Sequence, residues 1–212
     1  MKIALINENS QAAKNELICE TLKSVVEPMG HEVLNFGMYS SEDEVQLTYV
    51  MNGLLAAILL ESGAVDFVVT GCGTGQGAML ALNSFPGVLC GHVTDPTDAY
   101  LFAQVNNGNA VAMPFAQNFG WGAELNLKYT FEKLFAGEFG LGYPRERAIP
   151  EQRNKKILDD VKKVTHQDIL TILKNIDQDF LKTAIGGKEF ANLFFDNCKV
   201  PEIAEYIKSV LA

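Results

Sequence analysis

Residues 66 to 77 read Asp-Phe-Val-Val-Thr-Gly-Cys-Gly-Thr-Gly-Gln-Gly, an apolar run that ends in a thiol and then enters alternating glycines. The apolar run predicts a buried strand, and the apolar stretch 78–82 after the glycines predicts a helix. Because glycine leaves backbone amides uncovered, we expect the thiol of Cys72 beside amide groups that can stabilise a developing negative charge. The segment therefore predicts a strand, a turn that carries chemistry, and a helix.

The same alternation of strand and helix extends on both sides of this segment. The hydrophobic pattern predicts strands at 2–6, 31–36, 66–70, 87–93 and 109–113. Helices are expected between them, one of them started by Thr94-Asp95-Pro96, and another near 120–136. This order predicts a mostly parallel, five-stranded α/β sheet covered on both faces, with binding groups in the loops at the carboxyl ends of the strands.

The chain changes character beyond Gly142. Two prolines bracket the start of a basic stretch, after which short amphipathic helices run to the end. Thr165 and Asp168 suit a capping box that starts one of these helices. We therefore expect an α/β domain at 1–150 and a helical C-terminal extension at 151–212 that packs on the core or on a second subunit.

Composition and charge exclude several classes of function. The 212 residues carry a formal net charge of −9, with a pI near 4.8, which argues against binding to nucleic acid or to an anionic membrane surface. The four cysteines are not closely paired and the N-terminus shows no signal peptide, so we expect no disulfide framework and a cytoplasmic protein. The longest apolar stretch, 54–60, is too short to cross a bilayer.

Two general nucleotide-binding motifs do not fit the glycine loop. A dinucleotide fingerprint normally follows the first strand, whereas this loop follows the third, and Gln76 stands where the last glycine should fall. A P-loop needs a lysine, and no Lys or Arg occurs between Lys23 and Lys128. An anionic ligand near Cys72 must therefore take its cationic partners from outside that stretch.

The loop Cys72-Gly73-Thr74-Gly75-Gln76-Gly77, followed by Asn83 and by Phe85-Pro86-Gly87-Val88, resembles the signature of the ribose-5-phosphate isomerase B and galactose-6-phosphate isomerase family. The resemblance extends from Lys2 to about Gly142. It implies a doubly wound, Rossmann-like three-layer sandwich, and a homodimer or dimer of dimers with active sites at the subunit interface. It also implies interconversion of aldose and ketose sugar phosphates through an enediol(ate), without a metal or cofactor.

The resemblance assigns the chemistry to the glycine loop. Cys72 would be the base that moves a proton between C1 and C2, favoured as a thiolate by the N-terminus of the following helix, and Thr74 would assist proton movement between the two oxygens. Asn106 would contact sugar hydroxyls or the oxyanion. Backbone amides would stabilise that oxyanion, namely those of Gly73, Gly75 and Gly77. The alternative is that Cys72 is a buried small hydrophobe and that the glycines only turn the chain.

The family binds phosphate largely through arginines near the end of its core. Arg145, Arg147 and Arg153 fall in that region of this chain. We expect at least one of them to bind phosphate, from the same or the opposite subunit, because an uncompensated phosphate dianion in a cleft is costly. The alternative for each is an ordinary exposed arginine.

The departures from the family pattern concern substrate handling. The Asp-His pair that helps relatives to open a cyclic sugar is replaced by Glu8-Asn9, and the histidine before Asn106 is replaced by Val105. Glu8 could still serve as a lone acid or base, with Asn9 contacting the ligand. Because the proton-transfer loop is intact, the pattern predicts a changed substrate that is largely open-chain in solution.

Two classes of function follow from these residues. The first is an aldose-ketose isomerase acting on a sugar phosphate or a related polyol-derived acid, and the second is a catalytically silent sugar-phosphate binding or regulatory protein. A cysteine redox enzyme is disfavoured because no second cysteine stands at Cys-x-x-Cys spacing. His92, at the end of an expected strand, is predicted to be structural rather than catalytic.

Overall fold

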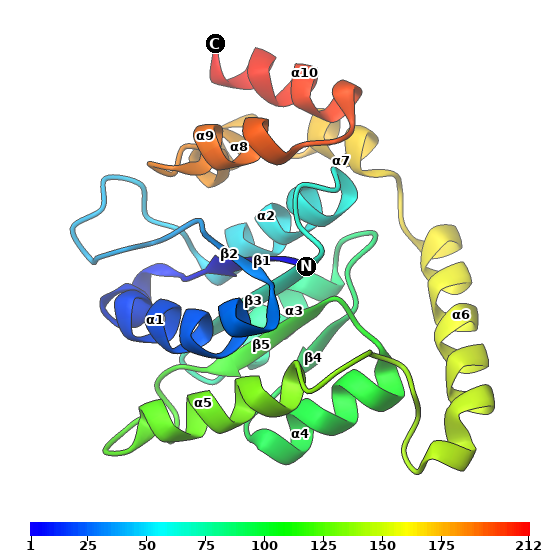
Figure 1. Ribbon diagram of the computed structural model, residues 1–212. Coiled ribbons are helices and arrows are strands. Elements are labelled where there is room, and N and C mark those ends of the chain that lie inside the picture. The colour runs from blue at the N-terminus through cyan, green and yellow to red at the C-terminus, as the bar shows by residue number, and fades with distance from the viewer.

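The computed structural model describes residues 1–212, and its centre is a five-stranded, fully parallel sheet with strand order β2-β1-β3-β5-β4. Its strands are β1 (Lys2–Ile6), β2 (Glu32–Asn35), β3 (Phe67–Cys72), β4 (Cys90–His92) and β5 (Ala110–Pro114). The order reverses direction beside β1 and β3, as in a doubly wound sheet. The predicted α/β fold class is confirmed (Figure 1).

Helices cover both faces of the sheet. The core helices are α1 (Asn15–Val26), α2 (Tyr49–Glu61), α3 (Gln76–Asn83), α4 (Pro96–Leu101, continued by the π-helical η3, Phe102–Asn106) and α5 (Ala123–Leu134). Short 3-10 helices lie at η1 (Asn9–Lys14), η2 (Glu27–Met29) and η4 (Arg145–Arg147). Helices α1 and α4 pack beside α5 on one face, and α2 packs beside α3 on the other.

The alternation of side chains along β3 explains this double cover. Phe67 and Val69 join a core cluster with residues of α1 and α5, whereas Val68 joins the cluster that contains α2. Successive side chains of a strand point to opposite faces of the sheet, so a strand that is apolar at every position must be covered on both. All six residues of β3 are buried.

The strands differ from the sequence prediction at their ends. β3 continues to Cys72, which pairs in register with Pro114 of β5, so the thiol belongs to the strand rather than following it. β4 covers only 90–92 of the predicted 87–93, because Gly87 adopts a positive φ of 67° and the amide of Leu89 donates to the side-chain oxygen of Asn109. The chain therefore turns before β4 begins.

The capping contacts show which of two predicted helix starts is correct. The start at Thr94-Asp95-Pro96 is confirmed, because the Asp95 carboxylate accepts from the amides of Thr97 and Asp98 at 2.7 and 2.9 Å. The capping box of Thr165 with Asp168 is wrong. Thr165 belongs to the preceding helix, where its hydroxyl donates to the carbonyl of Val161, and Asp168 alone caps the next one.

Five helices follow α5, and four of them contribute residues to the core cluster that contains α2. They are α6 (Ala148–Thr165), α7 (Ile169–Asn175), α8 (Gln178–Ile185), α9 (Phe190–Asn197) and α10 (Pro201–Leu211). Residues of α7 to α10 share one core cluster with α2, which explains why the middle of α2 is apolar all round. Helix α6 stands along the side of the molecule and has no buried residue (Figure 1). None of these helices is both long and apolar enough to span a membrane.

Candidate active site at the glycine loop

The carboxyl end of β3 is held closely against the loop after β5. The amide of Phe115 donates to the carbonyl of Cys72 at 2.9 Å, and the amides of Ala116 and Gln117 both donate to the carbonyl of Gly73. A Cβ on Gly71 would lie 2.3 Å from the carbonyl oxygen of Met113, so only glycine fits there. These contacts fix Cys72, whose exposed fraction is 8%, at the surface end of the sheet.

His92 holds the turn that follows. Its Nε2 lies 2.8 Å from the carbonyl oxygen of Thr74, and a Cβ on Gly75 would lie 2.9 Å from the imidazole ring. Gly75 has a φ of +78°, which L-residues with side chains rarely adopt. His92 therefore acts as a positioning residue for the loop, as predicted for a structural histidine.

The loop presents uncovered backbone donors. Gly73, Gly75 and Gly77 donate no hydrogen bond from their amides to another backbone group. α3 begins at Gln76, so these amides lie at a helix N-terminus, where negative charge is favoured. The hydroxyl oxygen of Thr74 accepts from the amide of Gln76 at 3.3 Å, which leaves the hydroxyl proton free to donate. The arrangement suits an oxyanion beside the thiol.

The first loop brings an acidic group to the same edge of the sheet. Glu8 is 3% exposed, and its two carboxylate oxygens accept from the amide and the hydroxyl of Ser10 at 2.9 and 2.6 Å. The side chain of Asn9 is exposed, while its amide donates to the carbonyl of Leu47 at 2.7 Å. β1 and β3 are hydrogen-bonded neighbours, so the loops after them meet at one edge.

Asn106 lies on a different side of the loop. It is exposed at the end of η3 and lines a cavity of about 480 Å³ together with Asn83, Cys90 and His92. His92 is the residue shared by this cavity and the glycine loop. Burial raises the pKa of the Cys90 thiol, so Cys90 is held as a thiol and is a poor alternative to Cys72 as a base.

The structure does not bring the three arginines to the glycine loop within one subunit. Arg145 and Arg147 lie on η4 and Arg153 lies on α6, and all three side chains are exposed. None forms an ion pair, since the four ion pairs of the chain all involve lysines. Their use in phosphate binding stays a prediction that needs a second subunit.

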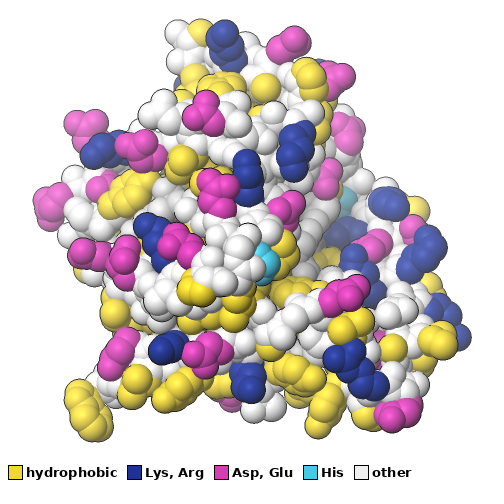
Figure 2. Space-filling model, in the orientation of Figure 1, with side chains coloured by type: hydrophobic (Ala, Val, Ile, Leu, Met, Phe, Trp, Pro, Cys, Tyr) yellow, Lys and Arg dark blue, Asp and Glu magenta, His cyan; other side chains and the backbone are white.

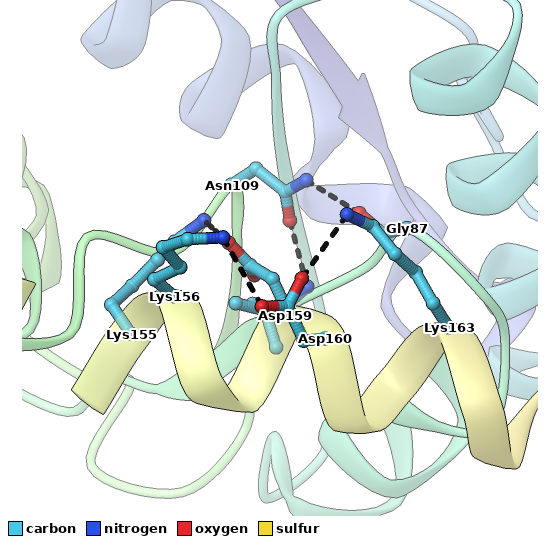
Figure 3. Close-up of polar contacts among 8 residues, drawn as sticks. Gly87, Asn109, Lys155, Lys156, Asp159, Asp160 and Lys163 are labelled. Atoms are coloured by element: carbon cyan, nitrogen blue, oxygen red, sulfur yellow. Dashed lines mark hydrogen bonds and ion pairs between the residues drawn. The ribbon is translucent and has the colours of Figure 1, made fainter. Parts of the chain in front are cut away.

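Lysines and arginines gather over α6, but several are already paired (Figure 2). Lys155 contacts Asp159 at 2.6 Å, and Lys156 contacts Asp160 at 3.1 Å (Figure 3). Lys162 donates to backbone carbonyls of the core, one of them that of Asn83 at 3.2 Å. Lys155, Lys162 and Lys163 line a cavity of about 400 Å³ between α6 and the core. Three carboxylates, those of Glu61, Asp159 and Asp168, line the same cavity, so the lysines there are matched by an equal number of acidic side chains. No three His, Cys, Asp or Glu side chains lie together as a metal-ligand set.

Comparison with known proteins identifies the family. Residues 3–136 match the model of the ribose/galactose isomerase family. The chain belongs to this family. Residues 164–210 match a second model, described as ribose-5-phosphate isomerase. The predicted resemblance is therefore confirmed, and relatives named as isomerases support an isomerase activity for this family member.

Two solved structures match this isomerase over its whole length. A 4-deoxy-L-threo-5-hexosulose-uronate ketol-isomerase, crystallised with a tartrate, is 64% identical with a TM-score of 0.98, covering 100% of this chain and 99% of that one. A ribose-5-phosphate isomerase from Vibrio parahaemolyticus is 54% identical with a TM-score of 0.97, over the same shares of the two chains. Both relatives share the helices after the sheet.

A curated relative matches over a shorter segment. Ribose-5-phosphate isomerase B of Escherichia coli (strain K12) is 34% identical over 83 residues, which are 39% of this chain and 54% of that protein. The isomerase thus spans about half the length of that curated relative. The two relatives that match the whole chain are named for different substrates. One is named for a uronate, which carries a carboxylate, and the other for ribose 5-phosphate, which carries a phosphate.

Sequence reasoning missed two residues near the loop of this isomerase. The ring of Tyr49 lies beside Gly77, where a Cβ would be 3.3 Å from it. The ammonium of Lys14 donates to the carbonyl of Phe115, the residue whose amide bonds Cys72. Lys14 could have been identified from the sequence, because this lysine precedes the stretch without Lys or Arg and lies in the loop after the first strand.

Proposed function

We propose that this isomerase converts an open-chain keto-uronate into the corresponding ketose through an enediolate, with Cys72 as the base. The substrate class is that named for the 64% identical relative. The observation that carries the proposal is that the proton-transfer loop is complete, whereas one subunit places no arginine at it and Glu8-Asn9 and Val105 replace the family's ring-handling residues.

The chemistry of that substrate class fits these replacements. A 4-deoxy-5-hexosulose uronate has an aldehyde at C1, a hydroxyl at C2, no hydroxyl at C4, a ketone at C5 and a carboxylate at C6. An aldose closes a five- or six-membered ring through the hydroxyl on C4 or C5, and this compound has neither. The substrate is therefore open without help, so an enzyme acting on it does not need a residue pair that opens rings.

The residues of the loop supply each step of the isomerisation. The Cys72 thiolate takes the proton from C2, the electron pair of that bond forms the C1=C2 double bond, and the negative charge moves to O1. The glycine amides stabilise this charge. O1 then gains a proton and O2 loses one, a transfer that Thr74 and Glu8 can assist, and the Cys72 thiol returns its proton to C1. The product carries a ketone at C2 and a hydroxyl at C1.

Helix α6 supports the expected homodimer. Its charged residues Lys155, Asp159 and Lys162 face the core, whereas Ile157, Val161 and Val164 lie on the opposite face and are at least half exposed. A helix normally turns its apolar stripe toward a partner. We infer that a second copy covers this stripe, and that the arginines on η4 and α6 reach the site from there.

A sugar-phosphate isomerase is the second candidate. It is favoured by the names of the Vibrio and Escherichia coli relatives. A phosphate dianion needs cationic partners, and the arginines indicated by the family resemblance, Arg145, Arg147 and Arg153, lie on η4 and α6, away from the glycine loop of their own subunit. A role for these arginines in phosphate binding therefore depends on the dimer.

Comparing substrates tests the proposal. The 4-deoxy-5-hexosulose uronate, ribose 5-phosphate and erythrose 4-phosphate are each incubated with the enzyme in D2O, and kcat/KM and deuterium at C1 or C2 are followed by NMR. We expect the uronate to be preferred by a factor on the order of 10² or more, the worth of a positioned acid or base. A higher kcat/KM on ribose 5-phosphate would overturn the proposal, and binding without exchange would support the catalytically silent alternative.

A further inference from the structure

We propose that Lys14 binds the carboxylate of the substrate beside the glycine loop; the substrate class in this inference rests on the proposed function. Lys14 is the last residue of η1 and lies directly before α1. The loops that follow the five strands are 7–14, 36–48, 73–75, 93–95 and 115–122, and Lys14 is the only Lys or Arg in any of them. It is therefore the one cation that this chain places in its own strand-end loops.

The contacts of Lys14 place its ammonium against the loop after β5, which is itself hydrogen-bonded to the glycine loop. Nζ donates to the carbonyl of Phe115 and lies 4.5 Å from the centroid of the Phe119 ring. The amide of Phe115 donates to the carbonyl of Cys72, and the next residue, Ala116, donates to the carbonyl of Gly73. A single residue thus connects the ammonium to the strand end that carries the thiol.

The surroundings of the ammonium leave room for an anion. Its hydrogen-bond partners are neutral, the carbonyl of Phe115 and the side-chain oxygen of Gln11 at 2.8 Å, and no carboxylate forms an ion pair with it. An ammonium has three N–H donors, so one is unused. Burial lowers the pKa of Lys14, which means that the charge is poorly compensated in the free protein. A bound carboxylate would supply the missing partner.

A hydrogen-bond network holds Lys14 in this position. The Gln11 amide nitrogen donates to the Ser10 hydroxyl at 3.0 Å, and that hydroxyl donates to the Glu8 carboxylate at 2.6 Å. These bonds orient the Gln11 side chain so that its oxygen faces Lys14. Gln11 is itself 8% exposed. The candidate acid-base Glu8 and the ammonium are therefore parts of one preorganised network, as a site for two ends of one small substrate requires.

Binding of tartrate, a small hydroxy-dicarboxylate, tests the charge separately from catalysis. Calorimetric titrations compare the wild type with Lys14→Met, Lys14→Arg and a matched control, Lys23→Met, which removes a partly buried lysine of α1 that is paired with Glu20 at 3.6 Å. We expect Lys14→Met to weaken tartrate binding by about 10- to 100-fold, as for loss of a hydrogen bond to a charged group, Lys14→Arg to retain part of it, and Lys23→Met to be unchanged. Threitol, the uncharged analogue of tartrate, should not bind to the wild type or to any of the three variants.

Tartrate binding by a folded Lys14→Met variant with wild-type affinity would overturn the inference. So would a wild type that binds threitol as well as tartrate, or one that binds neither. Circular dichroism melting of each variant establishes that it is folded.

A kinetic comparison separates this inference from the proposed function. With the keto-uronate, Lys14→Met should raise KM and change kcat little, and with the uronate methyl ester the variant and the wild type should agree. If the wild type does not turn over the uronate but Lys14→Met still loses tartrate, the proposed function fails and the Lys14 site stands. If the uronate is turned over equally by both proteins, the Lys14 site fails alone.

Discussion

At the scale of single residues, one of the four cysteines differs from the others in its surroundings. Burial raises the pKa of Cys19 and of Cys90, which keeps both as thiols, and Cys198 donates to the carbonyl of Val200 after α9. Cys72 instead ends β3 beside amides that have no backbone partner. The chemistry that we propose for Cys72 would therefore come from the loop around it rather than from the thiol itself.

Cys72→Ala should strongly slow isomerisation, because it removes the proposed base, and it should leave the fold intact, because it removes only a small side chain and keeps the glycine amides. We expect kcat to fall by a factor on the order of 10² to 10⁴, the usual worth of a positioned base. Deuterium uptake from D2O into substrate and product measures the proton transfer directly. Cys198→Ala is the control and should exchange at the wild-type rate; equal exchange by Cys72→Ala would show that another group is the base.

Gly75→Ala should destabilise the protein more than Gly30→Ala. Both glycines have a φ near +80°, but a Cβ on Gly30 meets nothing, whereas one on Gly75 would lie 2.8 Å from the backbone of Met113. We expect Gly30→Ala to cost about 1–2 kcal/mol of unfolding free energy from the left-handed conformation alone. Gly75→Ala should cost about 1–3 kcal/mol more from overpacking. Urea unfolding measures both, and equal losses would mean that the loop moves away freely.

At the scale of elements, α6 is unusual because its apolar stripe faces away from its own core. The core-facing side carries Lys155, Asp159 and Lys162, two of which pair with each other at 2.6 Å. Val164 on the opposite side is 87% exposed. Charges can face a polar cavity at small cost when they are paired and partly hydrated, but an exposed apolar stripe on an 18-residue helix is expected only where another chain covers it.

Val161→Asp should therefore weaken the homodimer, because a charge would be buried without a partner at the centre of the stripe. We expect the dimer dissociation constant to rise at least about tenfold, since an unpaired buried polar group costs roughly 1–3 kcal/mol or more. Sedimentation equilibrium measures it. Asn192→Asp, which adds the same charge at an exposed position of α9, is the control. A wild type that sediments as a monomer at all concentrations would contradict the inference.

At the scale of the whole molecule, the helices after α6 share a core with the sheet. The larger core cluster joins Phe190 and Phe194 of α9 with Leu54 and Ile58 of α2 and with Ala4 of β1. One face of α2 covers the sheet, and the other packs against α7 and α8, with α9 and α10 in the same core cluster. The α/β domain would expose that second face if the last helices were absent, so the two parts are expected to unfold together.

Phe194→Ala should lower the stability of the entire chain by about 3–5 kcal/mol, the usual cost of removing a fully buried phenylalanine. Phe194 is 0% exposed and its neighbour Phe195 is 38% exposed, so Phe195→Ala is a matched control with a smaller expected loss. Thermal unfolding is followed by circular dichroism, and hydrogen exchange of β3 amides reports on the sheet. A loss confined to the last helices, with β3 amides protected as before, would show that they unfold on their own.

The sequence by itself determined the order of strands and helices, the parallel sheet covered on both faces, and the turn after β3. These features follow from local patterns: an apolar run such as 66–70 needs cover on both sides, and alternating glycines favour a turn. The family resemblance placed the chemistry at the same loop. Element ends such as those of β4 were less accurate, because the Asn109 side chain and the turn at Gly87 replace strand pairing there.

Only the tertiary structure decided which residues surround the loop. Lys14 meets Phe115, and Lys2 meets Asn197, although these pairs are 101 and 195 positions apart in the chain. The core that α7 to α10 share with α2 and the outward apolar stripe of α6 were likewise decided only by the tertiary structure. Such contacts depend on how the crossovers bring distant segments together, and hydrophobic periodicity records only which face of an element is buried, not against which partner.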